Sequence, residues 1–324
     1  MLKVGKLCIE NPVLLAPMAG YTNLPFRLMA KKFGAGAVFS EMISGKGLYY
    51  KDAKTAELMR TIPREAPAAV QLFGSEPDIL AEVVEKYINP SPFAILDFNA
   101  GCPAPKIVKN GEGSALMRNP ALLGKIVSTL KSVSTKPVTV KTRIGWDEDS
   151  VNIREVAEIV EEAGADAHTI HGRTRKAFYS GKADWKIIGE VKRYSQGIPI
   201  ILNGDVDSGP KAREAFETTG CDAVMVGRAA VGNPFIFEEI TTYLKTGRQI
   251  CQSPAARIQT ALDHTELLAL MPRETAVVKE MRKHLAAYTK GLKNATRLRG
   301  EIFKVLTRDD IAALLTEYLE ACND

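Results

Sequence analysis

The chain has 324 residues, 45% of them hydrophobic and 25% charged, and its formal net charge is +5. This composition is typical of a globular protein with one large domain and a smaller one, and it excludes a membrane-spanning protein because no apolar run approaches bilayer length. The N-terminus lacks the apolar core of a signal peptide. Five scattered cysteines form no CxxC pair, so we expect no metal site, no disulfide framework and a cytoplasmic location.

Eight β-like runs, most of them followed by a helical segment, dominate the chain before the tail. Each run is a continuous stretch of Val, Ile, Leu and Ala, as expected for parallel strands with both faces buried. Predicted strands lie within residues 13–16, 37–44, 66–75, 93–98, 136–146, 165–175, 198–206 and 221–230. Predicted helices begin near 25 and at 77, and span 120–133, 151–163, 184–194 and 210–218. This order predicts the α/β class and a (β/α)8 TIM barrel.

The pattern changes after the eighth strand. The remainder shows only helical periodicity, in segments near 253–271, 274–290, 294–306 and 309–321. We therefore predict a barrel domain over residues 1–245 and an all-helical C-terminal domain over residues 246–324.

The most unusual stretch runs from Ala94 to Met117. Its apolar strand breaks into "NAGCP", which predicts that Cys102 lies at the rim of the barrel, where a substrate can reach it. The glycine-rich residues 109–117 predict a mobile loop, a candidate lid over that rim. The alternative is that Cys102 is one more small apolar residue, as most free cysteines are.

Polar or otherwise unusual side chains end one predicted strand after another. The C-terminal rim of the strands is the active-site face of a (β/α)8 barrel, so we predict that these side chains converge on one mouth. They are Met18, Gln71, Asn99, Cys102, Lys141, His171, Asn203, Asp205 and Arg228.

The last two strand ends indicate a phosphate site. The strings "NGDV" and "VGRAA" follow strands seven and eight, where barrel enzymes commonly bind phosphate through backbone N–H groups and a charged donor such as Arg228. Lys141 then suits either the N1/C2=O edge of a flavin, with Gln71 at the pyrimidine edge of that ring, or the Schiff base of an aldolase. Cys102 and the apolar turn at residues 17–19 favour the flavin, because such a turn can cover a ring face.

The helical tail is strongly basic. Between Lys279 and Arg308 there are nine basic residues and two acidic ones, a larger positive balance than that of the whole chain. One interpretation is a solvated helix face, and the other is a footprint for the phosphate backbone of a nucleic acid. The candidate contacts bracket a turn at Gly291 and are Arg282, Lys283, Lys290, Lys293, Arg297 and Arg299.

These motifs resemble those of the tRNA-dihydrouridine synthase family. The resemblance covers almost the whole chain and includes "APMAGYTNLPFR", "VQLFGS", "DFNAGCPAPKIVKNGEGSALM", "VTVKTRIGW", "HTIHGRTR", "ILNGDV" and "VMVGRAAVGNPF". The NxGCP string followed by the glycine loop is highly specific. The tail, with "HLAAYTKGLKNATRLRG", resembles the bacterial B-type branch.

The resemblance implies an FMN-dependent oxidoreductase that reduces the C5=C6 bond of a uridine in tRNA, with NADPH as reductant. The uridine would lie in the D-loop, near the elbow, at position 17 for the B-type branch, and the protein would act as a monomer without membrane contacts. Hydride would pass from flavin N5 to C6 of the uracil, Cys102 would give a proton to C5, and Asn99 would contact the uracil.

The resemblance also carries residue assignments. The loop "HGRTRKAFYSGK" offers Arg173, Arg175 and Lys176 as further RNA or uracil contacts. The implied FMN contacts are Pro17, Met18, Ala19, Gln71, Lys141, His171, Asn203, Gly204, Asp205, Gly227 and Arg228.

Two other classes of protein compete with this interpretation. A flavin-dependent barrel dehydrogenase or reductase for a small pyrimidine such as dihydroorotate would share the phosphate site and the cysteine, but it would not need the basic tail. An RNA-binding protein with a vestigial barrel would need the tail, but it would not need Cys102, Lys141 and His171 at strand ends.

Overall fold

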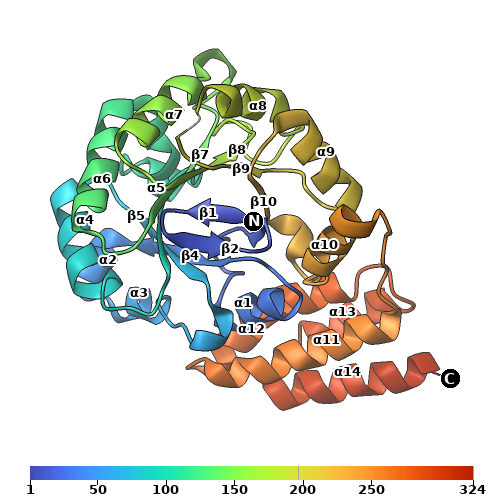
Figure 1. The fold of residues 1–324 in the computed structure, drawn as a ribbon. Helices are drawn as coiled ribbons and strands as arrows, with labels where there is room; N and C mark the ends of the chain where they lie inside the picture. Colours follow the sequence, from blue (N-terminus) through green and yellow to red (C-terminus); the bar gives the residue numbers. More distant parts are fainter. Residues whose placement is uncertain (196, 324) are drawn as a thin grey trace.

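The computed structural model describes residues 1–195 and 197–323. Eight parallel strands form a ring in the order β3-β10-β9-β8-β7-β6-β5-β4 (Figure 1). The first and last strands of this order meet where the Leu15 N–H donates to the Ala37 carbonyl oxygen at 3.0 Å, so the ring is nearly closed and the predicted TIM barrel is confirmed. The strands are β3 (Val13–Leu15), β4 (Val38–Ser44), β5 (Ala68–Phe73), β6 (Ile95–Ala100), β7 (Val138–Arg143), β8 (Ala167–His171), β9 (Ile200–Asn203) and β10 (Ala223–Val226).

Helices surround the ring on its outside (Figure 1). Several begin as the sequence predicts, with a polar cap followed by proline: the Asn119 side chain accepts from the Leu122 N–H just before α6. The helices are α1 (Leu24–Lys32), α2 (Gly45–Tyr49), α3 (Ala53–Glu57), α4 (Pro77–Val83), α5 (Pro105–Val108), α6 (Pro120–Val133), α7 (Ile153–Glu162), α8 (Trp185–Tyr194), α9 (Gly209–Thr219) and α10 (Ile236–Thr246). The other helical segments are the 3₁₀ helices η1 (Pro63–Glu65), η3 (Gly113–Arg118), η4 (Glu148–Ser150) and η5 (Arg228–Ala230) and the π-helical segment η2 (Val84–Ile88).

Each strand is buried on both faces because its side chains alternate between two apolar layers. Val13 and Leu15 of β3 pack in the layer between strands and helices, whereas Leu14 packs in the barrel interior. This arrangement explains the continuous apolar runs in the sequence, since neither face of a strand meets water. Buried polar side chains lie at the strand ends and also within the strands, among them Asp97, Thr139 and His168.

An N-terminal hairpin, which the sequence analysis did not predict, lies across one end of the barrel (Figure 1). Its strands are β1 (Leu2–Val4) and β2 (Leu7–Ile9), paired antiparallel. Leu2, Val4 and Ile9 are at most 2% exposed and pack against the interior layer, whereas Cys8 faces solvent. The alternating pattern is only three residues long in each strand, which is too short to predict a strand from sequence.

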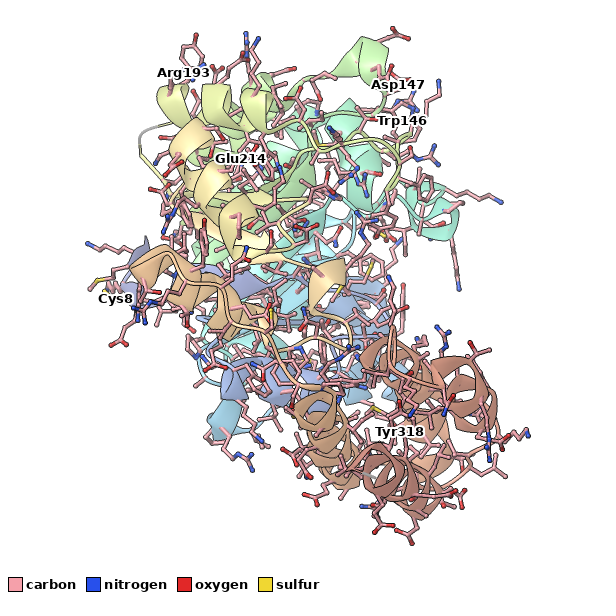
Figure 2. All side chains as sticks on the ribbon, turned by 90° about the vertical axis from the view of Figure 1, so that its right-hand side faces the viewer. Cys8, Trp146, Asp147, Arg193, Glu214 and Tyr318 are labelled. Atoms are coloured by element: carbon pink, nitrogen blue, oxygen red, sulfur yellow. The ribbon has the colours of Figure 1, made fainter. Side chains whose placement is uncertain are left out.

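The C-terminal tail forms a bundle of helices with a hydrophobic cluster of its own. Figure 2 shows the bundle below the barrel, on the same side of the view as Trp146, whereas Cys8 lies at the opposite end of the barrel. The barrel and the tail meet where the Phe26 ring of α1 packs against the His284 ring of the tail, with 4.6 Å between the ring centroids. The helices are α11 (Pro254–Leu267), α12 (Glu274–Tyr288), α13 (Ala295–Ile302) and α14 (Arg308–Asn323), with the turn η6 (Leu268–Leu270).

These helices correspond to the four predicted helical segments, and the division into domains at residues 245 and 246 stays a prediction. Within the described ranges, every helix is too short or too polar to cross a lipid bilayer.

We expect the hairpin to contribute to stability by sealing the barrel interior. Replacing Ile9 by alanine leaves a cavity under the strands and should lower the free energy of unfolding by about 2–4 kcal/mol, measured by urea denaturation. Cys8→Ala, on the same strand but facing solvent, should change it by less than about 0.5 kcal/mol. Equal effects of the two substitutions would show that the hairpin does not seal the barrel.

Candidate active site

A chain of hydrogen bonds runs across β5, β6 and β7 just below the mouth of the barrel. The Asp97 carboxylate, which is fully buried, accepts from Thr139 Oγ1 and from Gln71 Nε2, both at 2.6 Å. The Gln71 Oε1 atom in turn accepts from Asn99 Nδ2 at 2.8 Å. Burial raises the pKa of the Asp97 carboxyl to about 6, so at neutral pH it is mainly ionised and accepts both bonds. Asp97 therefore sets which way the two amides point.

The same chain ends on the backbone that carries Cys102. The Asn99 Oδ1 atom, turned away from Gln71, accepts from the Cys102 N–H at 2.9 Å and from the Gly101 N–H at 3.1 Å. On the other side, Ser114 donates both its N–H and its hydroxyl to the Cys102 carbonyl oxygen, at 3.0 and 2.9 Å. A side chain at Gly113 would meet that oxygen at 2.8 Å, so this approach requires glycine.

The loop predicted to be a mobile lid is thus packed in its second half. Residues 113–118 form η3, in which Leu116 and Met117 are buried, because the turn is anchored on Cys102 and closed by apolar contacts. Only its first half, residues 109–111, lies at the surface.

The Cys102 side chain is half-buried, and burial raises the pKa of its thiol above the ordinary value. The nearby cations Arg143 and Lys141 act in the opposite direction but less strongly. The thiol is therefore neutral at physiological pH and carries a proton that it can donate.

A second pair of predicted residues meets across the mouth. Lys141 on β7 donates from Nζ to Asn203 Oδ1 on β9 at 2.8 Å, and Asn203 Nδ2 donates to the Met225 carbonyl oxygen on β10 at 2.7 Å. Burial, aided by the positive charge of Arg143, lowers the pKa of Lys141 to about 8. An ammonium held with little solvent is suited to stabilise negative charge that develops beside it.

The loops after β8 and β9 are locked together by an ion pair. Arg173, 3% exposed, donates from one guanidinium nitrogen to both Asp205 carboxylate oxygens at 2.8 Å, and the Ala183 N–H donates to the same carboxylate at 2.7 Å. Arg173 also donates to the carbonyl oxygens of Ser180 and Gly181. Arg173 and Asp205 thus bind each other here, and the predicted roles of Arg173 in RNA binding and of Asp205 in cofactor binding stay predictions.

His171 and Arg228 lie beside this pair. His171 is 8% exposed, and burial, together with four surrounding cations, holds its pKa well below the ordinary range, so its imidazole is neutral. Arg228 is mostly exposed, with one guanidinium nitrogen 3.5 Å from Asp205. Gly204 has a φ of +114°, and a side chain there would collide with Ala183 and His171, so this buried backbone position requires glycine.

Sequence reasoning gave no role to two rim residues besides Asp97. Arg143 donates to the Gly101 carbonyl oxygen and to those of Thr174 and Phe178, so it joins the Cys102 turn to the loop after β8. The ring of Tyr179, 52% exposed, lies 5.6 Å from the Arg143 guanidinium, and the Arg228 guanidinium lies 4.8 Å from the same ring. Tyr179 could have been recognised as a candidate site residue from the sequence, because it is an aromatic residue in an otherwise polar loop.

The turn after β3 supplies Pro17, Met18 and Ala19. A side chain at Gly227, after β10, would lie 3.7 Å from Met18 Sδ, so the turn and the last strand end border one another. The predicted flavin contacts thus fit a ring-and-phosphate cofactor: an apolar turn, a half-buried ammonium, a neutral imidazole and a half-buried glycine at position 227.

The predicted RNA contacts come from two parts of the chain, the loop after β8 and the helical tail. Arg175 packs against the Trp146 ring at 4.6 Å and Lys176 is exposed. In the tail, Lys290, Lys293 and Arg297 are exposed.

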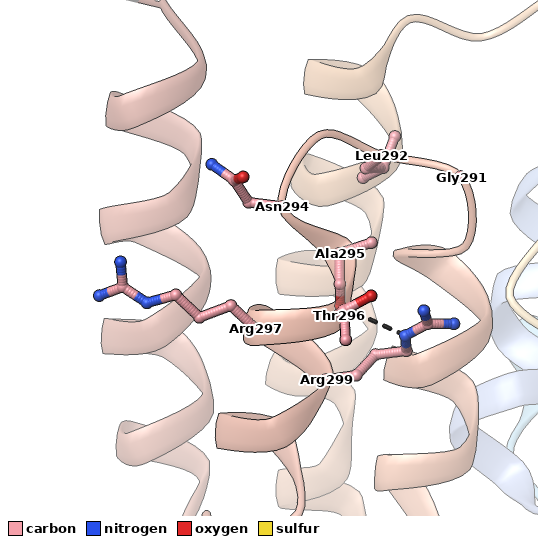
Figure 3. Close-up of a pocket in the computed structure, with 7 residues that line it drawn as sticks. All are labelled: Gly291, Leu292, Asn294, Ala295, Thr296, Arg297 and Arg299. Carbon is pink, nitrogen blue, oxygen red and sulfur yellow. Dashed lines mark hydrogen bonds between the residues drawn. The ribbon is translucent and has the colours of Figure 1, made fainter.

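The other tail cations make contacts inside the protein. Arg282 donates to the Val305 carbonyl oxygen, Lys283 to that of Gly20 and Arg299 to that of Ala295. Figure 3 shows Arg297 and Arg299 leaving α13 on opposite sides, beside an open hollow between residues 291 and 299. Of the six predicted RNA contacts in the tail, four are exposed: Lys283, Lys290, Lys293 and Arg297.

Among the described residues, no group of three or more His, Cys, Asp or Glu side chains is arranged to hold a metal ion. Cys8, Cys102, Cys221 and Cys251 are free thiols, and the side chain of Cys322 lies outside the described part of the chain.

A ring of parallel strands with a polar mouth at their C-terminal ends defines the class of (β/α)8-barrel enzymes. Two solved structures share this fold. One is a complex of 2-naphthoyl-CoA reductase with 2-naphthoyl-CoA, with a TM-score of 0.57 at 12% identity over 76% of this chain and 52% of that one. The other is a variant of NCR from Zymomonas mobilis, with a TM-score of 0.55 at 16% identity over 79% and 93% of the two chains.

Sequence comparison assigns the family. Residues 14–323 match the family model described as dihydrouridine synthase (Dus), and the chain belongs to this family. A probable tRNA-dihydrouridine synthase from Rickettsia bellii is 41% identical over 93% of both chains. A tRNA-dihydrouridine synthase B from Pseudomonas aeruginosa is 36% identical over 98% of this chain and 96% of its own. The resemblance predicted from the motifs is thus confirmed.

Because the hydrogen-bond chain from Asp97 sets the direction of each amide, we expect a substitution of Asp97 to loosen the backbone turn at Cys102. The test is made in a Thr139→Val background, because the Thr139 hydroxyl could otherwise accept from the new NH2 group. There, in Asp97→Asn, the new amide would donate to Gln71, both following amides would turn over, and the Asn99 NH2 would face the Cys102 N–H, so the turn would loosen. Alkylation of Cys102 by iodoacetamide, followed by peptide mass mapping, should become roughly tenfold faster, with Cys8 as an internal reference.

A second substitution tests whether the effect comes from the orientation of the amides or from a general loss of structure. Adding Asn99→Asp to Asp97→Asn restores an oxygen toward both Gln71 and the Cys102 N–H, and should return the alkylation rate toward that of the original protein. An unchanged rate in the single variant, or no recovery in the double variant, would contradict the directional chain.

Proposed function

We propose that this protein is a tRNA-dihydrouridine synthase that uses FMN and NADPH to reduce the C5=C6 bond of a D-loop uridine, at position 17. The observation that carries the proposal is the neutral thiol of Cys102, held from both sides of its backbone at the mouth of the barrel. Membership of the dihydrouridine synthase family and the names of its close relatives support the substrate.

FMN, when bound, supplies a hydride to C6 of the uracil. Pro17, Met18 and Ala19 would border the ring, Lys141 would stabilise the charge on its N1/C2=O edge, and the neutral imidazole of His171 would hydrogen-bond to it. The backbone at Gly204 and Gly227, with the Arg228 side chain, would hold the phosphate.

The protein's own chemical step is a proton transfer. As C6 gains hydride, negative charge builds at C5 and O4, and the Cys102 S–H gives its proton to C5, leaving a thiolate that solvent reprotonates. Because the pKa of the thiol is raised, the protonated form is available at neutral pH. Asn99, whose amide orientation is set through Gln71, would hold the uracil edge against this thiol.

The exposed cations outside the barrel favour RNA over a free pyrimidine as substrate. Lys290, Lys293 and Arg297 lie at the surface of the tail, and Lys176 lies at the rim. A target base must leave its stack to reach the mouth, which costs a few kcal/mol, and phosphate contacts from these residues would offset that cost. An enzyme for dihydroorotate would have no use for them, and a protein that only binds RNA would not need the ordered strand ends.

Replacing the proton donor should separate chemistry from cofactor binding. Cys102→Ala should keep FMN bound, because no predicted FMN contact is removed, and should lower the single-turnover rate of dihydrouridine formation by about 10²–10⁴-fold. Mass spectrometry of tRNA from the reaction gives this rate, and Cys8→Ala serves as the control. Full activity in Cys102→Ala would refute the proton-donor role.

Charge reversal on the tail tests the RNA surface. Lys290→Glu with Lys293→Glu should weaken tRNA binding and flatten the slope of log K against log salt by up to about 2, because two phosphate contacts are lost. Lys3→Glu with Lys6→Glu makes the same change of charge on the hairpin at the opposite end of the barrel and should leave the slope unchanged. If both pairs alter the slope equally, the footprint does not lie on the tail.

A further inference from the structure

The turn that follows β3 is held by the tail as well as by the barrel. We define the Met18 turn as residues 17–22, and within it the Tyr21 and Thr22 N–H groups both donate to the Met18 carbonyl oxygen at 3.0 Å. The Thr22 hydroxyl accepts from the Met18 N–H at 3.0 Å, which closes the turn. This turn is the segment proposed above to border the flavin ring.

Two charged side chains form hydrogen bonds with the backbone of Gly20 in this turn. Its N–H donates to a carboxylate oxygen of Glu41, which comes from β4 and is 9% exposed. Its carbonyl oxygen accepts from Lys283 Nζ on α12 of the tail at 2.9 Å. A barrel strand and a tail helix therefore hold the two sides of one residue with opposite charges.

Lys283 is exposed, but its ammonium lies against both Gly20 and Tyr21 of the turn. Gly20 has a φ of +73°, and a side chain built on it would lie 3.0 Å from Lys283 Nζ. The ammonium also lies 4.6 Å from the centre of the Tyr21 ring, which in turn meets the His284 ring edge-on at 5.6 Å. Two consecutive residues of α12 thus touch two consecutive residues of the Met18 turn.

We propose that Lys283 is a positioning residue for the flavin site, in that the tail, through this side chain, holds the Met18 turn in the conformation that borders the cofactor. This inference rests on the proposed function, because it assumes FMN at the mouth. It also replaces the prediction from sequence that Lys283 contacts RNA. The helical tail then has a part in cofactor binding in addition to its part in RNA binding.

The consequence is a physical link between the two surfaces. The proposed RNA contact Lys290 follows the C-terminal end of α12, about two helical turns after Lys283, which binds the turn proposed to border the cofactor. A small rotation of α12 on the barrel would move Lys283 relative to Gly20, and hence alter the border of the flavin ring.

A pair of substitutions on α12 tests the proposal. Lys283→Met keeps the length of the side chain and removes its donor, whereas Lys279→Met removes the same charge from an exposed position one turn earlier on the helix. We expect Lys283→Met to bind FMN roughly tenfold more weakly and to shift the visible absorption bands of the bound flavin. Lys279→Met should leave both properties unchanged. Flavin fluorescence titration without tRNA gives the affinities.

Further variants keep the test decisive. Lys283→Arg retains a donor that can reach the Gly20 carbonyl oxygen and should recover most of the affinity, while circular dichroism confirms that each variant is folded. If Lys283→Met matches Lys279→Met in FMN affinity and spectrum and loses only tRNA binding, Lys283 is a phosphate contact and the proposal is wrong. If the unaltered protein itself binds no FMN, the proposed function fails and this inference fails with it.

Discussion

The structure of the site depends on one carboxylate buried inside the barrel. Asp97 can only accept hydrogen bonds, so it orients Gln71, Gln71 orients Asn99, and Asn99 presents its oxygen to the backbone of Cys102. The direction of each amide follows from the one before it, and the thiol is placed by a group that it never touches. Burying this carboxylate is unfavourable, which is why its pKa rises to about 6, and its two donors offset that cost.

The mouth of the barrel combines several positive charges with two titratable groups that stay neutral. Several cations surround a neutral imidazole and a neutral thiol, and burial is the main reason why His171 and Cys102 stay uncharged. Such a site would suit the anionic cofactor and the reduction proposed above, because its cations would stabilise negative charge while the thiol keeps its proton. A more solvated mouth would lose both properties, because water would screen the cations and free the thiol to ionise.

The two ends of the barrel are closed differently, and the difference fits their roles. The N-terminal hairpin seals one end with apolar side chains, so nothing there needs to move. The other end is bordered by loops that hold each other through Arg173 and Asp205, Arg143 and Gly101, and Lys283 with the Met18 turn. The tail therefore completes the mouth, and RNA bound to it would lie next to the element proposed to cover the flavin.

The order of strands and helices, the basic tail and the cysteine in its glycine-rich setting were determined by sequence alone, because periodicity, turn residues and local motifs are properties of neighbouring residues. Only the tertiary structure decided what each polar side chain meets. Arg173 has the sequence signature of a surface cation but is buried, and Lys283 is exposed but bound to Gly20. The role of Asp97 inside the apolar strand β6 can be recognised only when Gln71 and Thr139 of the adjacent strands lie beside it. Such partners lie 26 to 42 residues away, and only closure of the barrel brings them within hydrogen-bond distance.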